Sequence, residues 1–111
     1  MQNDQAVTAL AALAQPTRLA IFRLLVEAGE AGLAVGSIGT AVGVAPTTLS
    51  FHLKTLAHAG LVDQRQQGRF VICSASFATM FGLIDYLTHD CCGGNLAACA
   101  PQAACNTKGQ Q

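Results

Sequence analysis

The sequence predicts a mostly helical α+β domain with about five helices and one two-stranded β-hairpin. Apolar residues recur at helical spacing over most of the first 90 positions. One stretch, residues 61–73, instead predicts two short strands around a glycine-bearing turn, which is typical of a hairpin. The length of 111 residues fits one domain. The expected organisation is a folded unit over residues 1–90, followed by a flexible, cysteine-containing tail over residues 91–111.

Two helices are expected at the start, over residues 4–14 and 16–29. Pro16 separates them, because proline fits the first turn of a helix, and Gly29 ends the second. Both helices carry few charges, so the first is expected to pack against another protomer. The apolar residues at helical spacing are Val7, Leu10, Ala11 and Ala14 in the first helix and Leu19, Phe22, Leu25 and Val26, facing inward, in the second.

The next two helices are expected to form a helix-turn-helix. The glycine-rich residues 32–43 predict a short third helix, with a glycine-rich loop as the alternative. In this interpretation Gly39 lies where two helices cross closely and Gly43 makes the turn. The fourth helix begins at Pro46 and ends before Gly60, which suits the left-handed position just past a helix.

The fourth helix has two different faces. Its apolar stripe, Leu49, Leu53 and Leu56, is expected to face the core. Hydroxyl groups, one cation and one aromatic ring on the other face can bind phosphates, base edges and a thymine methyl group, although a merely solvated face is the alternative. His52 falls near the apolar stripe and is expected to be a packed, orienting residue. The outward-facing residues are Thr47, Ser50, Phe51, Lys54, Thr55 and His58.

The hairpin is expected to pair residues 61–65 with residues 69–73 through a turn at residues 66–68. Two strands cannot stand alone, so they must lean on the helices. The tip residues Arg65, Gln67 and Arg69 can straddle a phosphate backbone or enter a minor groove. Cys73 in the return strand is expected to be a small core residue.

A last helix is expected after Ser76, which is a suitable N-cap. Only 11% of the residues are charged, against roughly 25% in an average soluble domain, whereas 51% are apolar. This excess of apolar surface predicts a second copy of the chain as partner, with the first and last helices as the dimer interface. The apolar residues at helical spacing in the last helix are Phe77, Met80, Phe81, Ile84 and Leu87.

The charge and the targeting signals restrict the function. Formal net charge is zero, so no global basic field attracts nucleic acid, but residues 45–73 hold Lys54, Arg65 and Arg69 against Asp63 alone among the acids. No signal-peptide pattern and no membrane-length apolar run are present, so a cytoplasmic protein without a membrane partner is expected. Five cysteines in a reducing compartment predict metal ligands or redox thiols rather than disulfides.

Four stretches together resemble one family, the ArsR/SmtB winged-helix metalloregulatory repressors of bacteria, over about residues 6–92. They are residues 15–21 (QPTRLAI), 49–54 (LSFHLK) with Leu56, 59–62 (AGLV) and 67–69 (QGR). The resemblance implies a winged helix-turn-helix homodimer that reads an imperfect inverted repeat of double-stranded operator DNA. It also implies a repressor of its own resistance operon that leaves DNA when a metal or metalloid binds.

The resemblance also places the DNA-binding residues by position. Six residues match the recognition helix of the family and three match the wing. They are Thr47, Thr48, Ser50, Phe51, His52 and Lys54 in the helix and Arg65, Gln67 and Arg69 in the wing.

The sequence departs from the two familiar metal sites of this family. The arsenic site is Cys-Val-Cys on the third helix, and the equivalent residues here are Ala34-Val35-Gly36. The zinc site on the last helix needs an early Asp-x-His and a later His with Glu, whereas residues 76–90 supply only His89, Asp85 and Asp90. Neither site is expected here.

The chain instead ends in a cluster of cysteines. Cys91 and Cys92 are expected at the end of the last helix, and two glycines after them let the chain double back toward Cys99. Trivalent arsenic takes three sulfurs in a pyramid, and a subset of arsenic regulators resembles this arrangement. We therefore expect As(III), or Sb(III), as the inducer on Cys91, Cys92 and Cys99, with Cys105 as a substitute or fourth sulfur.

Several alternatives remain for this tail. A four-cysteine zinc or cadmium site, a copper(I) or methylated-arsenical sensor, and a thiol redox switch of Cys91 and Cys92 use the same residues. An enzyme such as a thiol reductase is not expected, because the sequence has no Cys-x-x-Cys on a strand-to-helix turn, no phosphate loop, and no base near Cys91 except His89. No organic cofactor is expected.

Overall fold

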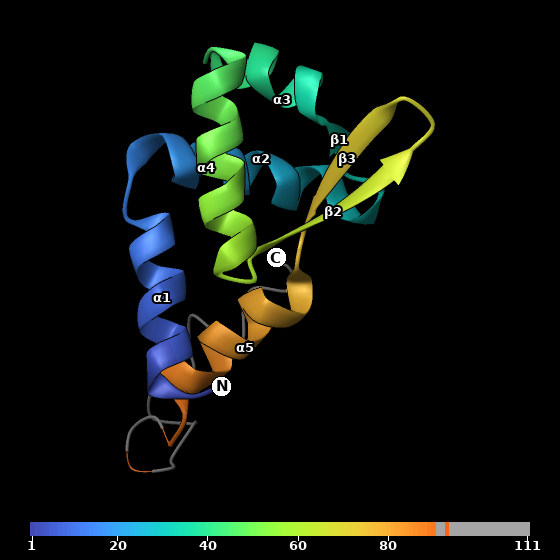
Figure 1. Cartoon of the computed structure of the whole chain (residues 1–111). Helices are drawn as coiled ribbons and strands as arrows, with labels where there is room; N and C mark the ends of the chain where they lie inside the picture. The colour runs from blue at the N-terminus through green and yellow to red at the C-terminus, as the bar shows by residue number, and fades with distance from the viewer. Residues whose placement is uncertain (91–92, 94–111) are drawn as a thin grey trace.

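A computed structural model describes residues 1–90 and residue 93. The chain forms five α-helices and a hairpin. Figure 1 shows that the twisted hairpin projects away from the helices. The mostly helical α+β class is therefore confirmed. In chain order the elements are α1 (Asn3–Leu13), α2 (Pro16–Ala28), the 3-10 turn η1 (Gly29–Ala31), β1 (Leu33–Ala34), α3 (Val35–Val42), α4 (Pro46–His58), β2 (Val62–Gln67), β3 (Phe70–Ala75) and α5 (Phe77–Thr88).

The helix ends follow local signals in the sequence. Gln15 caps α2 by accepting a hydrogen bond from the Arg18 backbone N–H at 2.8 Å, and Pro16 occupies the first turn. The Ser76 hydroxyl caps α5 by accepting from the Thr79 N–H at 3.3 Å, as predicted. Gly60 follows the end of α4 with φ of +79°, the left-handed geometry expected of it.

One predicted face differs from the face observed. Leu19 is 45% exposed, and Ile21 takes the inward position on α2 together with Phe22 and Leu25. The reason is the direction of α2, which crosses beneath both α3 and α4 and so buries a face rotated from the predicted one. Helix α1 buries only alanines against its own chain, because α1 lies close to its neighbours. The buried alanines are Ala6, Ala9 and Ala12.

The core lies where α2, α3 and α4 meet the sheet. Its largest fully buried side chains are branched aliphatic groups and one thiol, each at most 2% exposed. Burial of these side chains is the main favourable contribution to folding. These largest fully buried side chains are Ile21, Leu25, Ile38, Leu49, Leu56, Leu61 and Cys73.

The sheet has three antiparallel strands in the order β1-β3-β2, so the prediction of a two-stranded hairpin was incomplete. Strand β1 pairs Leu33 with Cys73 and Ala34 with Ile72. A two-residue strand has no periodicity, so only its tertiary pairing identifies it. The hairpin turn was also predicted too early: Gln67 pairs with Phe70, so residues 68–69 make the turn.

Gly32 is expected to be required for this sheet. It has φ of +70° and ψ of −166°, and a Cβ atom there would collide with the Cys73 backbone carbonyl. Gly32→Ala should therefore lower the free energy of unfolding by about 2–3 kcal/mol. Gly36→Ala is the matched control, because a Cβ there meets no atom within 4 Å. Urea denaturation measures both, and equal stability of the two variants would contradict the prediction.

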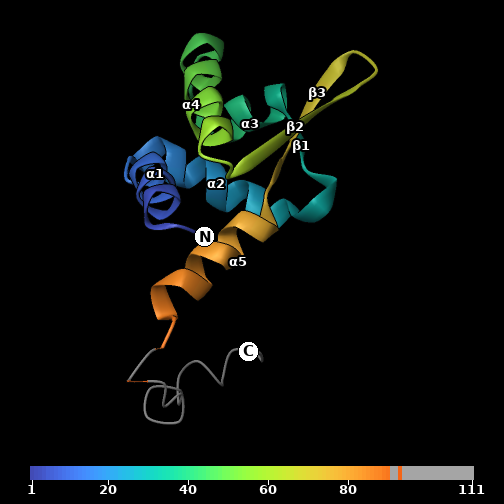
Figure 2. The same ribbon diagram turned by 60° about the horizontal axis from the view of Figure 1, so that its bottom comes forward.

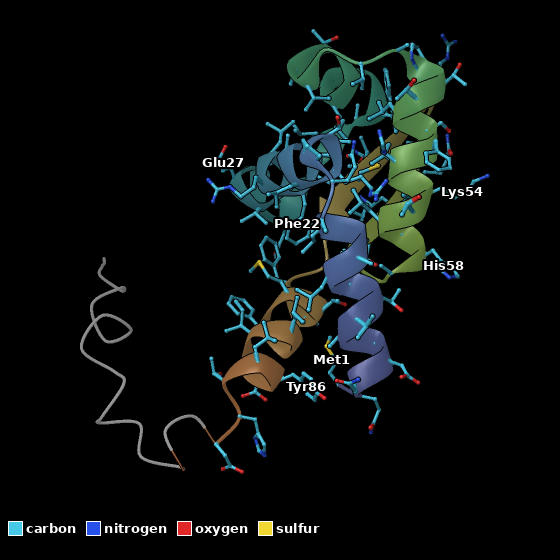
Figure 3. The ribbon with its side chains drawn as sticks, turned by 90° about the vertical axis from the view of Figure 1, so that its left-hand side faces the viewer. Met1, Phe22, Glu27, Lys54, His58 and Tyr86 are labelled. Carbon is cyan, nitrogen blue, oxygen red and sulfur yellow. The ribbon has the colours of Figure 1, made fainter. Side chains whose placement is uncertain are left out.

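Helices α1 and α5 carry large apolar side chains that the rest of the chain does not cover. Helix α5 lies against the N-terminal half of α1, and the Tyr86 hydroxyl donates to Asn3 Oδ1 at 3.0 Å (Figures 2 and 3). Only Leu83 of α5 is fully covered by its own chain. The large apolar residues left exposed on the two helices are Val7 (56%), Leu10 (42%), Phe81 (60%), Ile84 (50%) and Leu87 (59%). We refer to these five residues as the apolar face.

Within residues 1–90 and 93, no single helix has both the length and the apolar composition needed to cross a membrane; α1 and the segment Pro16–Ala31 reach them only as a pair bent by 101°.

Candidate nucleic-acid interface

Helices α3 and α4 form the predicted helix-turn-helix. Gly43 ends α3 in the left-handed conformation, with φ of +73° and ψ of +39°. A Cβ on Gly39 would lie 3.2 Å from Leu49 Cδ2 and 3.6 Å from the Val44 carbonyl oxygen, so the two helices cross closely at this glycine. The structure confirms both predicted glycine roles and excludes a glycine-rich loop at α3.

The outer face of α4 presents the side chains predicted to read DNA. Thr47, Thr48, Ser50 and Lys54 are exposed, and the Phe51 ring is 64% exposed. Figure 3 shows Lys54 on the outer side of α4, on the opposite side of the molecule from Glu27. The apolar stripe Leu49, Leu53 and Leu56 is buried, as predicted.

The N-terminus of α4 adds backbone donors to this face. Its N-cap, Ala45, provides no side-chain hydrogen bond, so the first N–H groups beside Thr47 and Thr48 are available to an acceptor. The positive end of the helix dipole favours an anion at the same place. The start of α4 is therefore suited to a phosphate group of a nucleic acid.

His52 differs from the other predicted residues of α4 because it points inward. It is 8% exposed and is the one buried polar residue among the described positions. Its Nδ1 atom lies 3.4 Å from Arg18 Nη1, and its ring meets the Phe51 ring edge-on, with centroids 5.8 Å apart. The expected packed histidine is confirmed.

A groove of about 540 Å³ separates α4 from the wing, the hairpin formed by β2, its turn and β3. Lys54 lines one wall and Arg69 the other, and the ion pairs of the described residues, Arg23–Glu27 and His89–Asp90, involve neither of them. Two such cations in one groove can neutralise a phosphate group. The other lining residues are Ala34, Val35, Gly36, Ser50, Leu53, Ala57, Gln64, Phe70 and Val71.

The structure does not bring Arg65 into this groove. Successive side chains of a strand point to opposite faces, so Arg65 points away from the face on which Gln64 lines the groove. The Arg65 guanidinium donates to the Ala31 carbonyl at 2.9 Å, which ties β2 to η1. Gln67 is exposed next to the turn, as the sequence predicts for a tip residue.

Phe70 is a candidate that sequence reasoning missed. It is 62% exposed and lines the groove opposite α4. An exposed aromatic side chain beside two cations is typical of a surface that binds a partner. The sequence signal that could have identified Phe70 is its position as an aromatic residue directly after the turn of a short, polar hairpin.

Cys73 is a core residue, as predicted. It is fully buried, and the Gln64 amide donates to its sulfur at 3.8 Å. Burial raises the pKa of the Cys73 thiol, and the hydrogen bond from Gln64 offsets this only in part. A buried thiol that stays protonated is a poor metal ligand.

The predicted inducer site lies outside the described residues. This applies to Cys91, Cys92, Cys99 and Cys105. The structure does describe the three residues that stand where the family has Cys-Val-Cys. Ala34 ends β1, and Val35 and Gly36 begin α3 on the wall of the groove. They carry no thiol, as the sequence already shows.

Comparisons with known proteins agree with this geometry. A sequence-family model described as a helix-turn-helix domain matches residues 13–65. An uncharacterised HTH-type transcriptional regulator of Bacillus subtilis, YceK, is 39% identical over 70 residues, which cover 61% of this chain and 69% of that protein.

Two solved structures show a similar fold. An ArsR-like transcriptional regulator from Rhodococcus sp. RHA1 superposes with a TM-score of 0.71 at 23% identity, over 94% of this chain and 95% of that one. The homodimeric winged helix-turn-helix DNA-binding domain of Mb0332 from Mycobacterium bovis, described as a possible ArsR-family regulator, has a TM-score of 0.64 at 29% identity. That alignment covers 83% of this chain and 85% of that domain. The chain therefore belongs to the helix-turn-helix transcriptional regulators, and it is of the ArsR winged-helix type.

Proposed function

We propose that this regulator is a homodimeric repressor that binds an operator and releases it when As(III), or alternatively Sb(III), binds cysteine thiolates after α5. The ligands in this proposal are Cys91, Cys92 and Cys99, with Cys105 as a substitute or fourth sulfur. One observation carries the proposal: four of the five cysteines lie within residues 91–105, directly after the helix that bears most of the apolar face.

The apolar face supports a homodimer. Its five large side chains are 42–60% exposed, and two of them project from α1 and three from α5. Large apolar side chains left exposed on two helices that contact each other are typical of an interface. The Mycobacterium bovis neighbour is homodimeric, and a two-fold axis through α1 and α5 would present two α4 helices to one duplex.

Thiolate chemistry supports a soft, thiophilic inducer. Cysteine sulfur selects soft acceptors over magnesium or calcium, and three thiolates satisfy a pyramidal As(III) centre. Zinc or cadmium, copper(I), a methylated arsenical and a disulfide of Cys91 with Cys92 remain the competing ligands or chemistries for the same residues.

The position of the cysteines supports coupling to DNA binding. Cys91 lies three positions after Thr88, the last residue of α5. A ligand that ties the chain back onto the end of α5 would change how the apolar faces of two protomers meet, and so the spacing of the two α4 helices. A hundredfold loss of operator affinity needs roughly 2.7 kcal/mol of coupling, within the usual range for allosteric proteins.

The test is an operator-binding titration by fluorescence anisotropy. The duplex is the site that the wild-type protein selects from a random library, and the ligands As(III), Sb(III), Cd(II), Zn(II) and Cu(I) are added separately under reducing conditions. We expect release by As(III), and by Sb(III) if the site accepts both. Release by Zn(II) or Cd(II) alone would replace the arsenic assignment, and release only after an added oxidant would favour the redox switch.

The groove between α4 and the wing makes a separate prediction about salt. Lys54→Ala and Arg69→Ala should each reduce the slope of log affinity against log salt by about 2 per dimer, because each removes one phosphate contact per protomer. Arg65→Ala should change the slope less, since its guanidinium is engaged by Ala31. Arg23→Ala is the control, because Arg23 pairs with Glu27 at 3.5 Å on α2. An unchanged slope in both groove variants would contradict the phosphate contacts.

A further inference from the structure

Arg18 connects two helices at the corner between α1 and α2. Its backbone N–H bonds the Gln15 side chain at 2.8 Å, which fixes the residue in the first turn of α2. Its Nε atom donates to the Ala12 carbonyl at 2.7 Å, at the end of α1, where the last carbonyls of a helix lack partners within that helix. Of these two contacts, only the one to Ala12 holds the half-buried guanidinium itself, and it does not involve α4.

The same guanidinium reaches the middle of α4. Its Nη1 atom lies 3.4 Å from Nδ1 of His52, which is 8% exposed. A guanidinium can only donate, so in a hydrogen bond between these two atoms Nδ1 of His52 is the acceptor. The pair is thus a directional polar contact between the α1–α2 corner and the inner side of the recognition helix.

Directional contacts are scarce on the inner side of α4. The other buried side chains there are Leu49, Leu53 and Leu56, and apolar packing tolerates small shifts along or around a helix better than a hydrogen bond does. His52 lies between Phe51 and Lys54 in the sequence, and both of these neighbours are on the outer face of α4. A small rotation of α4 at His52 would therefore move the side chains that face DNA.

We propose that Arg18 and His52 form a positioning pair that sets the placement of α4 relative to α1, and thereby the specificity of operator binding. The proposal rests on the proposed operator function and on α1 as a dimerisation helix. Neither residue is required to touch DNA in this role. Arg18 is bonded to the Ala12 carbonyl at the end of α1 and contacts His52 in α4. A change in the position of α1 at the dimer interface would therefore change the position of α4.

A positioning role predicts a particular pattern of binding. Loss of the contact should weaken binding to the selected operator about tenfold, the effect of losing one hydrogen bond to a charged group. Binding to a random duplex should stay within about twofold, and the salt slope should not change, because no phosphate contact is removed. A purely structural role would instead lower thermal stability and both kinds of DNA binding together.

The experiment compares two replacements of His52 that separate its acceptor from its ring. His52→Asn keeps an acceptor, Oδ1, near the place of Nδ1, whereas His52→Phe keeps a ring without an acceptor. We expect His52→Asn to bind the selected operator within about threefold of wild type and His52→Phe to lose about tenfold. Arg18→Met should lose as much as His52→Phe, and the double variant should lose no more than either single variant.

Gln15→Ala is the control for stability. It removes the cap of α2 but neither side chain of the pair, so it should lower the melting temperature without lowering the ratio of operator to random-duplex affinity. The proposal is overturned if His52→Phe keeps the wild-type ratio, or if Gln15→Ala loses the ratio as His52→Phe does. A wild-type protein that selects no duplex overturns the proposed operator function instead, and this inference with it.

Discussion

Cys91→Ser and Cys92→Ser are each expected to bind the operator like wild type and to require at least about a hundredfold more As(III) for release. Each replacement leaves only two of the three expected sulfurs in the site, and a hydroxyl group is a poor substitute for a thiolate with a soft acceptor. Because α4 and the wing are unchanged, DNA affinity without ligand should be preserved. The measurement is the anisotropy titration on the selected duplex.

Two further variants define the ligand set. Cys99→Ser should behave like Cys91→Ser if Cys99 is the third ligand, and Cys105→Ser should then release normally. The opposite result for these two residues would make Cys105 the third sulfur. Normal release by As(III) in both Cys91→Ser and Cys92→Ser would show that the site assignment is wrong.

Ile84→Glu is expected to convert the proposed dimer into monomers and to reduce operator affinity by about a hundredfold or more. Ile84 lies within the apolar face and is 50% exposed in the single chain, so a carboxylate there is tolerated by the monomer. In a dimer the charge would be buried without a partner, at a cost of about 3–5 kcal/mol. Sedimentation equilibrium gives the oligomeric state, and anisotropy on the selected duplex gives the affinity.

Asp85→Asn is the matched control for this prediction. Asp85 is the exposed neighbour of Ile84 on α5, outside the apolar face, so its replacement should leave both the dimer and operator binding intact. A dimer that survives Ile84→Glu at micromolar concentration would place the interface elsewhere. Loss of the dimer with full operator affinity would show that one recognition helix is sufficient.

Local signals explain why most elements could be predicted. Pro16, Gly43, Gly60 and Ser76 act through backbone geometry or a single nearby hydrogen bond, so their roles follow from their immediate neighbours. The two faces of α4 could be predicted for the same reason, since a 3.6-residue period separates buried from exposed positions without knowledge of the partner.

Features that depend on distant partners could not be predicted. Strand β1 exists only because β3 offers it a free edge, and Gly32 is needed only because the Cys73 carbonyl approaches it. The engagement of Arg65 by Ala31 is of the same kind. In each example the two partners are more than 30 positions apart in the chain, so no local sequence pattern predicts that they are in contact.

The sequence by itself determined the helical class, the helix-turn-helix, the outward face of α4 and the composition of the cysteine cluster, because each depends on spacing or residue type alone. The tertiary structure decided which face α2 buries, that Lys54 and Arg69 share a groove while Arg65 does not, and that His52 meets Arg18. These features depend on the angles at which helices and strands pack, and those angles arise from the whole core rather than from any one segment.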